Sequence, residues 1–507
     1  MSNKKINQVK AGVVLNYAVI GLNAFVGLLY TPFLLRCLGQ SEYGLYSLVS
    51  SIIAYLSILD LGFGSSVVRY TARLRAQNLT QEQYKLFGMF LVLYAILGAI
   101  AFCLGLGLYF NVDTLFGTTM SAQEISRAGI MMLLLVINLT LTFPLSTFGS
   151  IIQAYENFVF LKLVEIIRIL LTTIVMICLL FFGYKAIALV FVQTVFNLMS
   201  LVLHWIYCFK ILHIKILFGS FDLCLLKEVS KYSFWIFIMI IVDRIYWGTG
   251  QFVLGSLVGT VAVAIFSVAI QLHTMYQQFS TAISSIFLPR VSSMVAINDN
   301  ANEISALFIK TGRLQYIVMS FILSAFIIFG KAFITLWAGE DYYMSFWIAL
   351  LFLVPSTIPL VQNLGIVILQ ARNQMKFRSL AYMIISLCSL VLQIIFVRQY
   401  GVIGCAIAIC IALVVGQIIV MNIYYSYSQK IDIKCFWVNI IKMTIVPTII
   451  CCICCYTLAQ EYIVINDWRS LIIGIVVFCI VYLPLTYKWQ MNNYERNIIR
   501  NLIKFIK

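Results

Sequence analysis

Apolar segments about 20 residues long follow one another along almost the whole chain, and this pattern limits the folds open to it. A helix needs about 20 mostly apolar residues to cross a membrane, and fourteen segments of the 507 residues qualify. With 63% hydrophobic and 10% charged residues, the chain lacks the polar surface of a soluble protein of this length. We predict an all-α polytopic membrane protein. The predicted spans are 11–35, 43–65, 86–110, 128–149, 160–182, 186–208, 232–256, 260–286, 314–337, 343–369, 378–397, 401–424, 437–459 and 470–488.

The basic residues indicate how these spans are oriented. The N-terminus, MSNKKINQVK, is short and basic, and the apolar stretch after it is longer than a signal-peptide core, so we expect an uncleaved first span. With fourteen spans, 26 of the 34 Lys and Arg residues fall on one side and 6 on the other. The positive-inside rule then places both termini in the cytoplasm. The net charge of +16 is therefore interpreted as a topology signal rather than a nucleic-acid footprint.

An internal repeat suggests two similar halves. Residues 38–48 (LGQSEYGLYSL) align without a gap over residues 258–268 (VGTVAVAIFSV), and residues 143–158 resemble residues 358–375 with small gaps. Parallel repeats of six spans are typical of transporters, with a substrate site between the two lobes. The predicted parts are an N-lobe at 1–215, a C-lobe at 216–430, and two extra spans with a basic tail at 431–507.

Polar residues within the predicted spans are the candidates for that site. Asp243 and Arg244 lie near the middle of the seventh span, where a charge usually faces a cavity or a partner. The repeat aligns Asp243 with Asn23 of the first span, and Asn16 and Asn23 share one helix face with Thr31. These positions predict a substrate cavity or a cation site; the alternative is a structural ion pair and helix–helix hydrogen bonds.

The eighth span adds a polar stripe. Ser267, Gln271, Thr274 and Gln278 recur at helical spacing on one face, which supports a cavity lining. His273 lies off this stripe, so we interpret it as structural rather than as a proton carrier.

Glu165 and Arg168 of the fifth span are one turn apart and can pair. Arg168 can also extend toward the cytoplasmic surface, because long basic side chains reach the membrane interface. A functional and a structural role are both open for this pair.

The cytoplasmic end of the second span carries an unusual group of residues. Asp60 is followed by Gly62 and Gly64 and then by Arg69. The repeat aligns Arg69 with Pro289 and Tyr70 with Arg290, so a basic residue closes both segments. The glycines allow the helix to loosen or another backbone to approach, and arginines suit phosphate recognition. The alternative is a basic, glycine-rich anchor at the membrane surface.

The sequence gives little support for a bound cofactor or for an enzymatic activity. The CCICC run at 451–455 lies within a span and fits no zinc spacing, so we predict that it is structural and that the protein holds no metal or cofactor. No phosphate-binding loop or nucleophile elbow occurs. A membrane glycosyltransferase or polymerase is disfavoured because the predicted outer loops are short, and we predict that the protein is not an enzyme.

Residues 32–70 (PFLLRCLGQSEYGLYSLVSSIIAYLSILDLGFGSSVVRY) resemble the start of the oligosaccharide flippase, or polysaccharide biosynthesis protein, family of the multidrug/oligosaccharidyl-lipid/polysaccharide exporter superfamily. The resemblance rests on Leu38-Gly39, Glu42-Tyr43-Gly44 and Asp60-Leu-Gly-Phe-Gly, with AYENF at 154–158 in support. It implies a flippase in the bacterial cytoplasmic membrane that moves a polyprenyl-diphosphate-linked oligosaccharide outward by alternating access. Expected neighbours are a glycosyltransferase and a polymerase.

A second function stays open within the same superfamily. A drug or metabolite antiporter would use Asp243 or Glu165 to carry H⁺ or Na⁺. The two hypotheses differ in cargo and in the need for a coupling ion.

Overall fold

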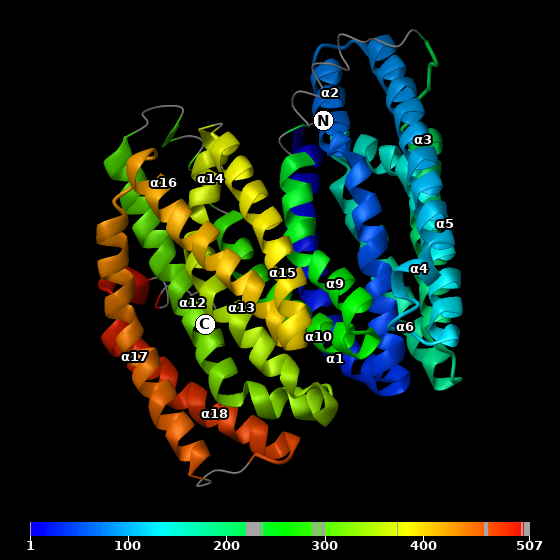
Figure 1. The fold of residues 1–507 in the computed structure, drawn as a ribbon. Coiled ribbons are helices and arrows are strands. Elements are labelled where there is room, and N and C mark those ends of the chain that lie inside the picture. The colour runs from blue at the N-terminus through cyan, green and yellow to red at the C-terminus, as the bar shows by residue number, and fades with distance from the viewer. Residues whose placement is uncertain are drawn as a thin grey trace. The chain divides into compact units, whose positions relative to one another are not determined.

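The computed structural model describes residues 2–219, 234, 237–285, 287, 291, 294, 295, 300–372, 374–460, 465–497 and 500. These residues form helices and loops, and none of them lies in a strand (Figure 1). Contacts divide the chain into two units, residues 1–267 and 268–507. The predicted boundaries at 215 and 430 remain predictions.

The first unit contains nine named helical elements and a further helical stretch at 237–247. The elements are α1 (Ser2–Leu56), η1 (Ser57–Asp60), α2 (Phe63–Ala76), α3 (Thr80–Phe110), α4 (Val112–Phe116), α5 (Ala122–Ala154), α6 (Phe158–Phe181), α7 (Ala186–Lys210) and α9 (Thr249–Leu257); α10 (Thr260–Ser285) begins in this unit.

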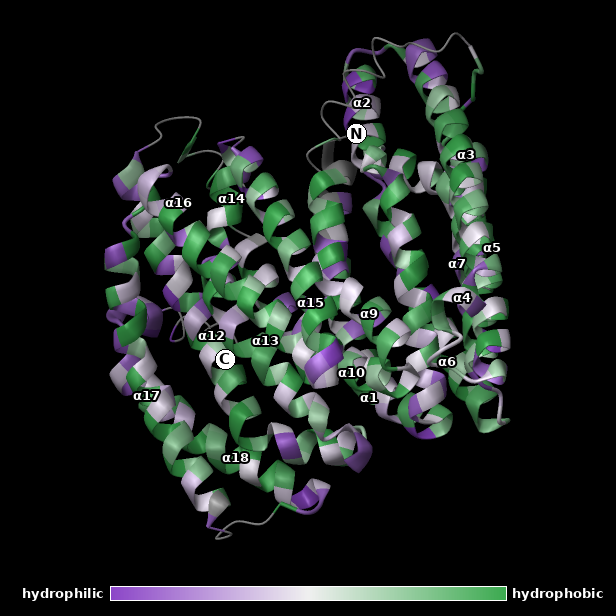
Figure 2. Cartoon of the chain, in the orientation of Figure 1, coloured by the Kyte–Doolittle hydropathy of each residue, from purple (hydrophilic) through white to green (hydrophobic). Residues whose placement is uncertain are grey.

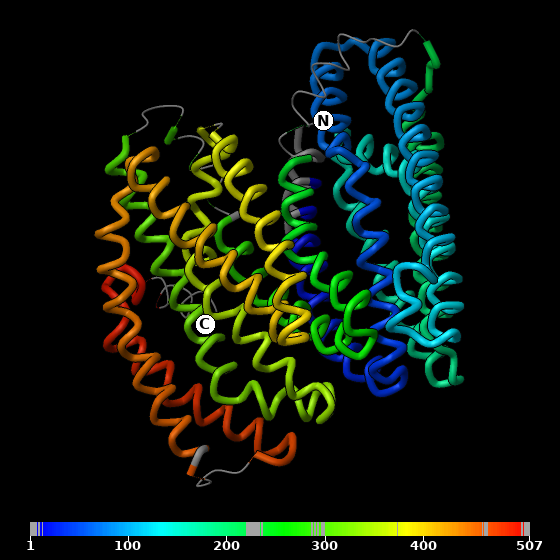
Figure 3. Tube along the Cα trace, in the orientation of Figure 1, coloured from blue at the N-terminus to red at the C-terminus, as the bar shows by residue number. Residues whose placement is uncertain are grey.

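The long helix α1 is two arms joined at Gly39. The backbone there is non-helical, with φ of 75°, a conformation that favours glycine. Figure 3 shows the chain reversing direction between the arms. The break lies between the first two predicted spans, as expected.

The loops of the first unit gather at two ends. At one end, Gln83 Nε2 donates to the Tyr155 hydroxyl at 3.1 Å, and the Leu217 amide donates to the Tyr84 carbonyl at 3.2 Å. At the other end, Thr119 Oγ1 donates to the Gly255 carbonyl at 2.8 Å. The first set joins loops predicted to face the cytoplasm, and the second joins loops predicted to face outward. The grouping therefore matches the predicted topology.

The second unit is built around α12. Its elements are α12 (Ala301–Trp337), η2 (Glu340–Tyr342), α13 (Met344–Val361), α14 (Leu364–Ala371), α15 (Met375–Ala412), η3 (Leu413–Val420), α16 (Met421–Tyr427), α17 (Ile433–Ala459), α18 (Trp468–Leu485) and η4 (Thr486–Gln490). Helix α12 packs against α13, α17 and α18. An apolar cluster that includes Phe329, Ile450 and Phe478 forms this core.

Helix α15 also folds back on itself, at Gly401. The φ of Gly401 is 57°, and Cys405 Sγ lies 3.7 Å from Gln393 Oε1 across the turn. A Cβ at Gly404 would lie 2.1 Å from the Phe396 carbonyl oxygen, so the two arms touch closely. This turn lies at the predicted break between residues 397 and 401.

At least two of the predicted spans, 43–65 and 343–369, are not continuous. The span expected at 343–369 is broken at Gln362 and Asn363, between α13 and α14. Some backbone hydrogen bonds there run from an amide to the carbonyl three residues earlier, as from the Asn363 amide to the Leu360 carbonyl at 3.3 Å. Pro355 and Pro359 lie inside α13 and lack the amide hydrogen that would support the preceding turns.

Twelve helical segments among the described residues are long and apolar enough to cross a membrane, and two of these are the folded-back helices at Gly39 and Gly401. Large apolar side chains cover the outer faces of the helices. On α17 the exposed residues Ile441, Ile445, Ile449 and Ile453 follow one another at one-turn spacing. Figure 2 shows hydrophobic residues along the helices and hydrophilic residues gathered toward their ends. The protein is therefore a multi-pass membrane protein; the orientation of its termini remains a prediction.

Candidate functional site

Asp243 and Arg244 lie in the first unit on the helical stretch 237–247. The Asp243 side chain is exposed and the Arg244 side chain is half-buried. The Tyr55 hydroxyl lies 2.6 Å from Thr249 Oγ1 and 3.3 Å from the Arg244 carbonyl oxygen. The second arm of α1 thus fixes the backbone at Arg244 and leaves Asp243 accessible.

The polar stripe predicted on the first arm of α1 is only partly accessible. Asn16 and Asn23 are exposed, and Thr31 is buried. Their place in a substrate cavity remains a prediction.

The polar residues predicted to form a stripe on α10 differ in their exposure along the helix. Ser267 is buried and accepts a hydrogen bond from Gln251 Nε2 at 2.9 Å. Gln271 is half-buried, and Thr274 and Gln278 are exposed. Accessible polar groups are therefore confined to the later part of the predicted stripe, and a role for Gln271 and Gln278 in a cavity stays a prediction.

His273 of α10 is 3% exposed, and its Nε2 lies 3.0 Å from Ser356 Oγ on α13. Its ring also meets the ring of Phe352 edge-on. These contacts support the structural interpretation of His273.

Asp60 stands at a break between two helices. Leu61 and Gly62 both have positive φ, at 53° and 71°, and α2 begins at Phe63. Asp60 Oδ1 accepts a 2.7 Å hydrogen bond from the Tyr94 hydroxyl of α3. The sequence predicted that the helix could loosen here. The structure has a defined break between η1 and α2, and the hydrogen bond between Tyr94 and Asp60 holds it.

The arginines after this break lie at the surface. Arg69 is exposed on α2, and the Arg75 guanidinium stacks over the Tyr155 ring at 4.3 Å. Arg290 lies outside the described residues. A phosphate-binding role for Arg69 and Arg290 remains a prediction.

Glu165 and Arg168 do not pair as the sequence suggested. Glu165 Oε2 pairs with Lys162 Nζ at 2.8 Å, one turn earlier on α6. Arg168 Nη1 instead donates to Asn197 Oδ1 on α7 at 3.1 Å. The correction follows from packing: Arg168 points toward a polar neighbour on another helix, and Lys162 supplies the closer charge.

Asn197 extends this contact into a network across three helices. Its Nδ2 donates to Asn138 Oδ1 at 2.8 Å and to Thr142 Oγ1 at 3.0 Å, both on α5. The network joins α5, α6 and α7 with one cation inside a hydrophobic bundle, where such groups are rare and usually functional. Asn138 and Asn197 were not predicted from the sequence; an asparagine within each of the fourth and sixth predicted spans was the available signal.

A second polar network surrounds the break between α13 and α14. Asn363 Nδ2 donates to Ser284 Oγ at 3.0 Å and lies 3.3 Å from Ser280 Oγ. Gln362 Nε2 donates to Asn422 Oδ1 on α16 at 2.8 Å. Broken helices in transporters are typical of substrate or ion sites. These residues were not predicted from the sequence.

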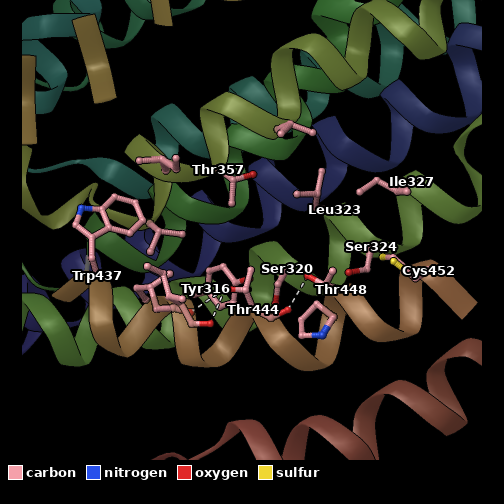
Figure 4. Close-up of a pocket in the computed structure, with 17 residues that line it drawn as sticks. Tyr316, Ser320, Leu323, Ser324, Ile327, Thr357, Trp437, Thr444, Thr448 and Cys452 are labelled. Carbon is pink, nitrogen blue, oxygen red and sulfur yellow. Dashed lines mark hydrogen bonds between the residues drawn. The ribbon is translucent and has the colours of Figure 1, made fainter. Parts of the chain in front are cut away.

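A cavity of about 410 Å³ lies in the second unit among α12, α13 and α17 (Figure 4). Its walls are mostly apolar, with Leu323, Ile327 and Trp437 among them. Hydroxyl groups occur around it, on Tyr316, Ser320, Ser324, Thr357, Thr444 and Thr448. Such a space suits an apolar chain or ring with a few polar atoms.

The CCICC run lies on α17, and Cys451 and Cys452 are among the residues that line this cavity. All four cysteines of the run are free thiols. Among the described residues, no group of three or more His, Cys, Asp or Glu side chains could hold a metal ion.

Comparison with known families gives a direct result. The family model described as "Polysaccharide biosynthesis protein" matches residues 9–295, which is more than half of the chain. The chain belongs to this family. A putative O-antigen transporter of Shigella flexneri is 21% identical over 396 residues, covering 77% of this chain and 92% of that protein. One from Salmonella typhi is 34% identical over 61 residues, covering 12% of this chain and 14% of that protein.

Solved structures give the fold. A lipid II flippase, MurJ, in an inward closed conformation matches with a TM-score of 0.68 and 18% identity, covering 96% of this chain and 99% of MurJ. An inward-facing multidrug transporter of the MATE family, within the MOP superfamily, matches with a TM-score of 0.57 and 13% identity, covering 78% of this chain and 96% of that protein. The protein therefore has the fold of the MOP superfamily, as the resemblance implied.

Proposed function

We propose that the protein is a flippase that moves a polyprenyl-diphosphate-linked oligosaccharide from the inner to the outer leaflet of a bacterial cytoplasmic membrane by alternating access. The observation that carries the proposal is the fold match with a lipid II flippase, which extends over 96% of this chain. The match with the multidrug transporter covers 78% of this chain. Membership of the polysaccharide biosynthesis family supports the same cargo class.

The chemistry of the polar residues suits such a cargo. The Arg168 guanidinium retains donors beyond its bond to Asn197, and Arg244 is half-buried on an intramembrane helix. Guanidinium groups recognise diphosphates by paired hydrogen bonds, and exposed Asn and Gln side chains suit sugar hydroxyls. The apolar cavity beside α17 has the character that a polyprenyl chain needs.

Energy for outward movement need not come from nucleotide hydrolysis. An inside-negative potential favours export of an anionic diphosphate by about 2.3 kcal/mol per charge per 100 mV. Removal of the product outside the cell would add a further driving force.

The test uses pure protein in liposomes with a fluorescent polyprenyl-diphosphate oligosaccharide and a glycan-cleaving enzyme outside. Wild type is expected to accelerate exposure of the glycan, and Arg244→Ala to lose most of that acceleration. Arg398→Ala, which removes an exposed arginine near the Gly401 turn, is the matched control. No acceleration by folded wild type with a matched glycan would contradict the proposal.

The similarity to multidrug transporters favours one second candidate, an ion-coupled antiporter that uses Asp243 or Glu165. Drug efflux that collapses in Asp243→Asn while surface glycan stays normal would support it. Normal efflux in that variant would exclude Asp243 as the coupling residue.

A further inference from the structure

One face of the second arm of α1 forms a continuous contact with the helical stretch 237–257 and the start of α10. Ser41, Gly44, Leu48 and Tyr55 lie on this face, at spacings of three, four and seven residues. We call this contact the outer seam, because it runs toward the end of the first unit predicted to face outward.

Backbones meet unusually closely along the outer seam. A Cβ added to Gly44 would lie 1.8 Å from the Thr260 carbonyl oxygen. A Cβ on Gly255 would lie 2.7 Å from Leu48 Cδ1. A glycine on each side removes the side chain that would otherwise hold the two surfaces apart, so the Thr260 backbone reaches Gly44 and the Leu48 side chain packs directly on Gly255.

A single carboxylate closes the end of the seam. Glu124 Oε1 accepts hydrogen bonds from Ser41 Oγ of α1 at 2.5 Å and from Thr260 Oγ1 of α10 at 2.9 Å. Its Oε2 accepts from the Ser121 amide at 2.9 Å within a capping box. Glu124 therefore belongs to α5 but holds both sides of the outer seam.

Neighbouring bonds reinforce this end. Arg127, one turn after Glu124, pairs with the buried Glu42 of α1. Thr119 Oγ1 donates to the Gly255 carbonyl at 2.8 Å. Glu42 and Gly255 lie at or next to helix ends predicted to face outward, and Thr119 lies on a loop predicted to face the same way, so this cluster is a closure at one predicted surface of the membrane.

We propose that the outer seam is the outward gate of the transport cycle and that Glu124 is its latch. The inference rests on the proposed function, because alternating access requires a closure of this kind. The sequence repeat assigns residues 216–430 to the second lobe, so α9 and the start of α10 would move away from α1 when the outer side opens. Hydroxyl–carboxylate bonds at a surface exchange readily with water, which suits a reversible latch.

A cross-link tests whether the seam must open. The Oγ atoms of Ser41 and Thr260 bond to the same carboxylate oxygen, so a Ser41→Cys/Thr260→Cys variant can be joined by oxidation or by a short bifunctional thiol reagent. Cross-linking is expected to abolish flipping in the liposome assay, and a reductant to restore it after oxidation. Each single variant serves as a control. Flipping at the wild-type rate by the cross-linked protein would overturn the proposal.

A second measurement does not depend on flipping. Ser51 is buried on the seam face, so a Ser51→Cys thiol reports on opening when labelled by a maleimide in detergent, after subtraction of labelling at the native cysteines. Glu124→Ala is expected to raise the labelling rate about fivefold, as the loss of hydrogen bonds predicts. Ser66→Cys, buried in α2, controls for general loosening. Unchanged labelling at Ser51→Cys would overturn the latch, whereas failure of wild type to flip would count against the proposed function alone.

Discussion

The Tyr94 hydroxyl donates a 2.7 Å hydrogen bond to Asp60 Oδ1, at the point where two positive-φ residues separate η1 from α2. Tyr94 is almost fully buried and belongs to α3, within the apolar core of the first unit. The bond therefore ties the break after α1 to the apolar core of that unit.

Removing this donor is expected to destabilise the first unit. Tyr94→Phe removes the hydroxyl donor to Asp60 Oδ1, which costs about 1–3 kcal/mol. Thermal unfolding of the purified protein in detergent measures the effect as a lower Tm. Tyr84→Phe on the same helix is the control. Equal Tm values for Tyr94→Phe and wild type would show that the bond contributes nothing.

The buried ion pair between Arg313 and Glu495 gives a second prediction. Arg313 Nε donates to Glu495 Oε1 at 2.6 Å, and Nη2 donates to Oε2 at 3.0 Å. Glu495→Gln leaves a buried guanidinium without its counter-charge, which typically costs about 3–5 kcal/mol. A marked fall in Tm is expected. Glu82→Gln, which breaks the exposed pair with Lys85, is expected to change stability by less than about 1 kcal/mol.

The double variant Arg313→Met/Glu495→Leu separates charge from packing. It is expected to recover much of the stability lost in Glu495→Gln, because apolar residues of similar size can replace a buried pair. A double variant less stable than Glu495→Gln would contradict this account.

Gly44 gives a third prediction. A methyl group at this position meets the Thr260 carbonyl, a backbone atom that cannot swing aside. Gly44→Ala is expected to cost about 1–3 kcal/mol and to weaken the contact between α1 and α10. Gly107→Ala on α3 is the control, because a Cβ there meets nothing within 4 Å, and it is expected to be neutral or slightly stabilising. Matching Tm values for the two variants would refute the close approach.

The cap of α18 gives a pH prediction. The Ser470 hydroxyl and amide donate to Asp467 Oδ1 at 2.6 Å and 2.9 Å, and these bonds hold the pKa of Asp467 below its usual range. A group with a lowered folded-state pKa stabilises above its unfolded-state pKa and loses that effect as the pH falls through the folded-state value. The Tm difference between wild type and Asp467→Ala should therefore be full near pH 7 and shrink toward acid. A constant difference would contradict the cap.

Much of the fold was predictable because a membrane span is recognised from a continuous run of apolar residues in the sequence. The turns at Gly39 and Gly401 were expected from short interruptions between apolar runs, and the structure places positive-φ glycines at both. The break at Gln362 was missed, because the apolar run continues through it. Its causes include side-chain bonds to Asn422 and, from Asn363, to Ser284, which depend on contacts distant in sequence.

The candidate sites were less predictable for a related reason. Intramembrane charges stand out in a sequence, so Arg168 and Asp243 were found at once. Their partners are set by which helices pack together, so Asn197 was missed and Glu165 was given the wrong partner. No sequence pattern pointed to Glu124, because its two hydroxyl donors, Ser41 and Thr260, come together only in the folded chain.

The pair between Arg313 and Glu495 also bears on how the protein can be handled. The residues after α18 are anchored to α12 through this pair and through Lys310, whose Nζ lies 3.5 Å from the centre of the Tyr494 ring. If the chain were cut directly after η4 and an affinity tag or fluorescent protein joined there, these two contacts would be lost. A tag joined beyond Arg496 would leave both contacts in place. The tail up to that residue therefore sets the shortest chain at which a tagged protein keeps these contacts of its second unit.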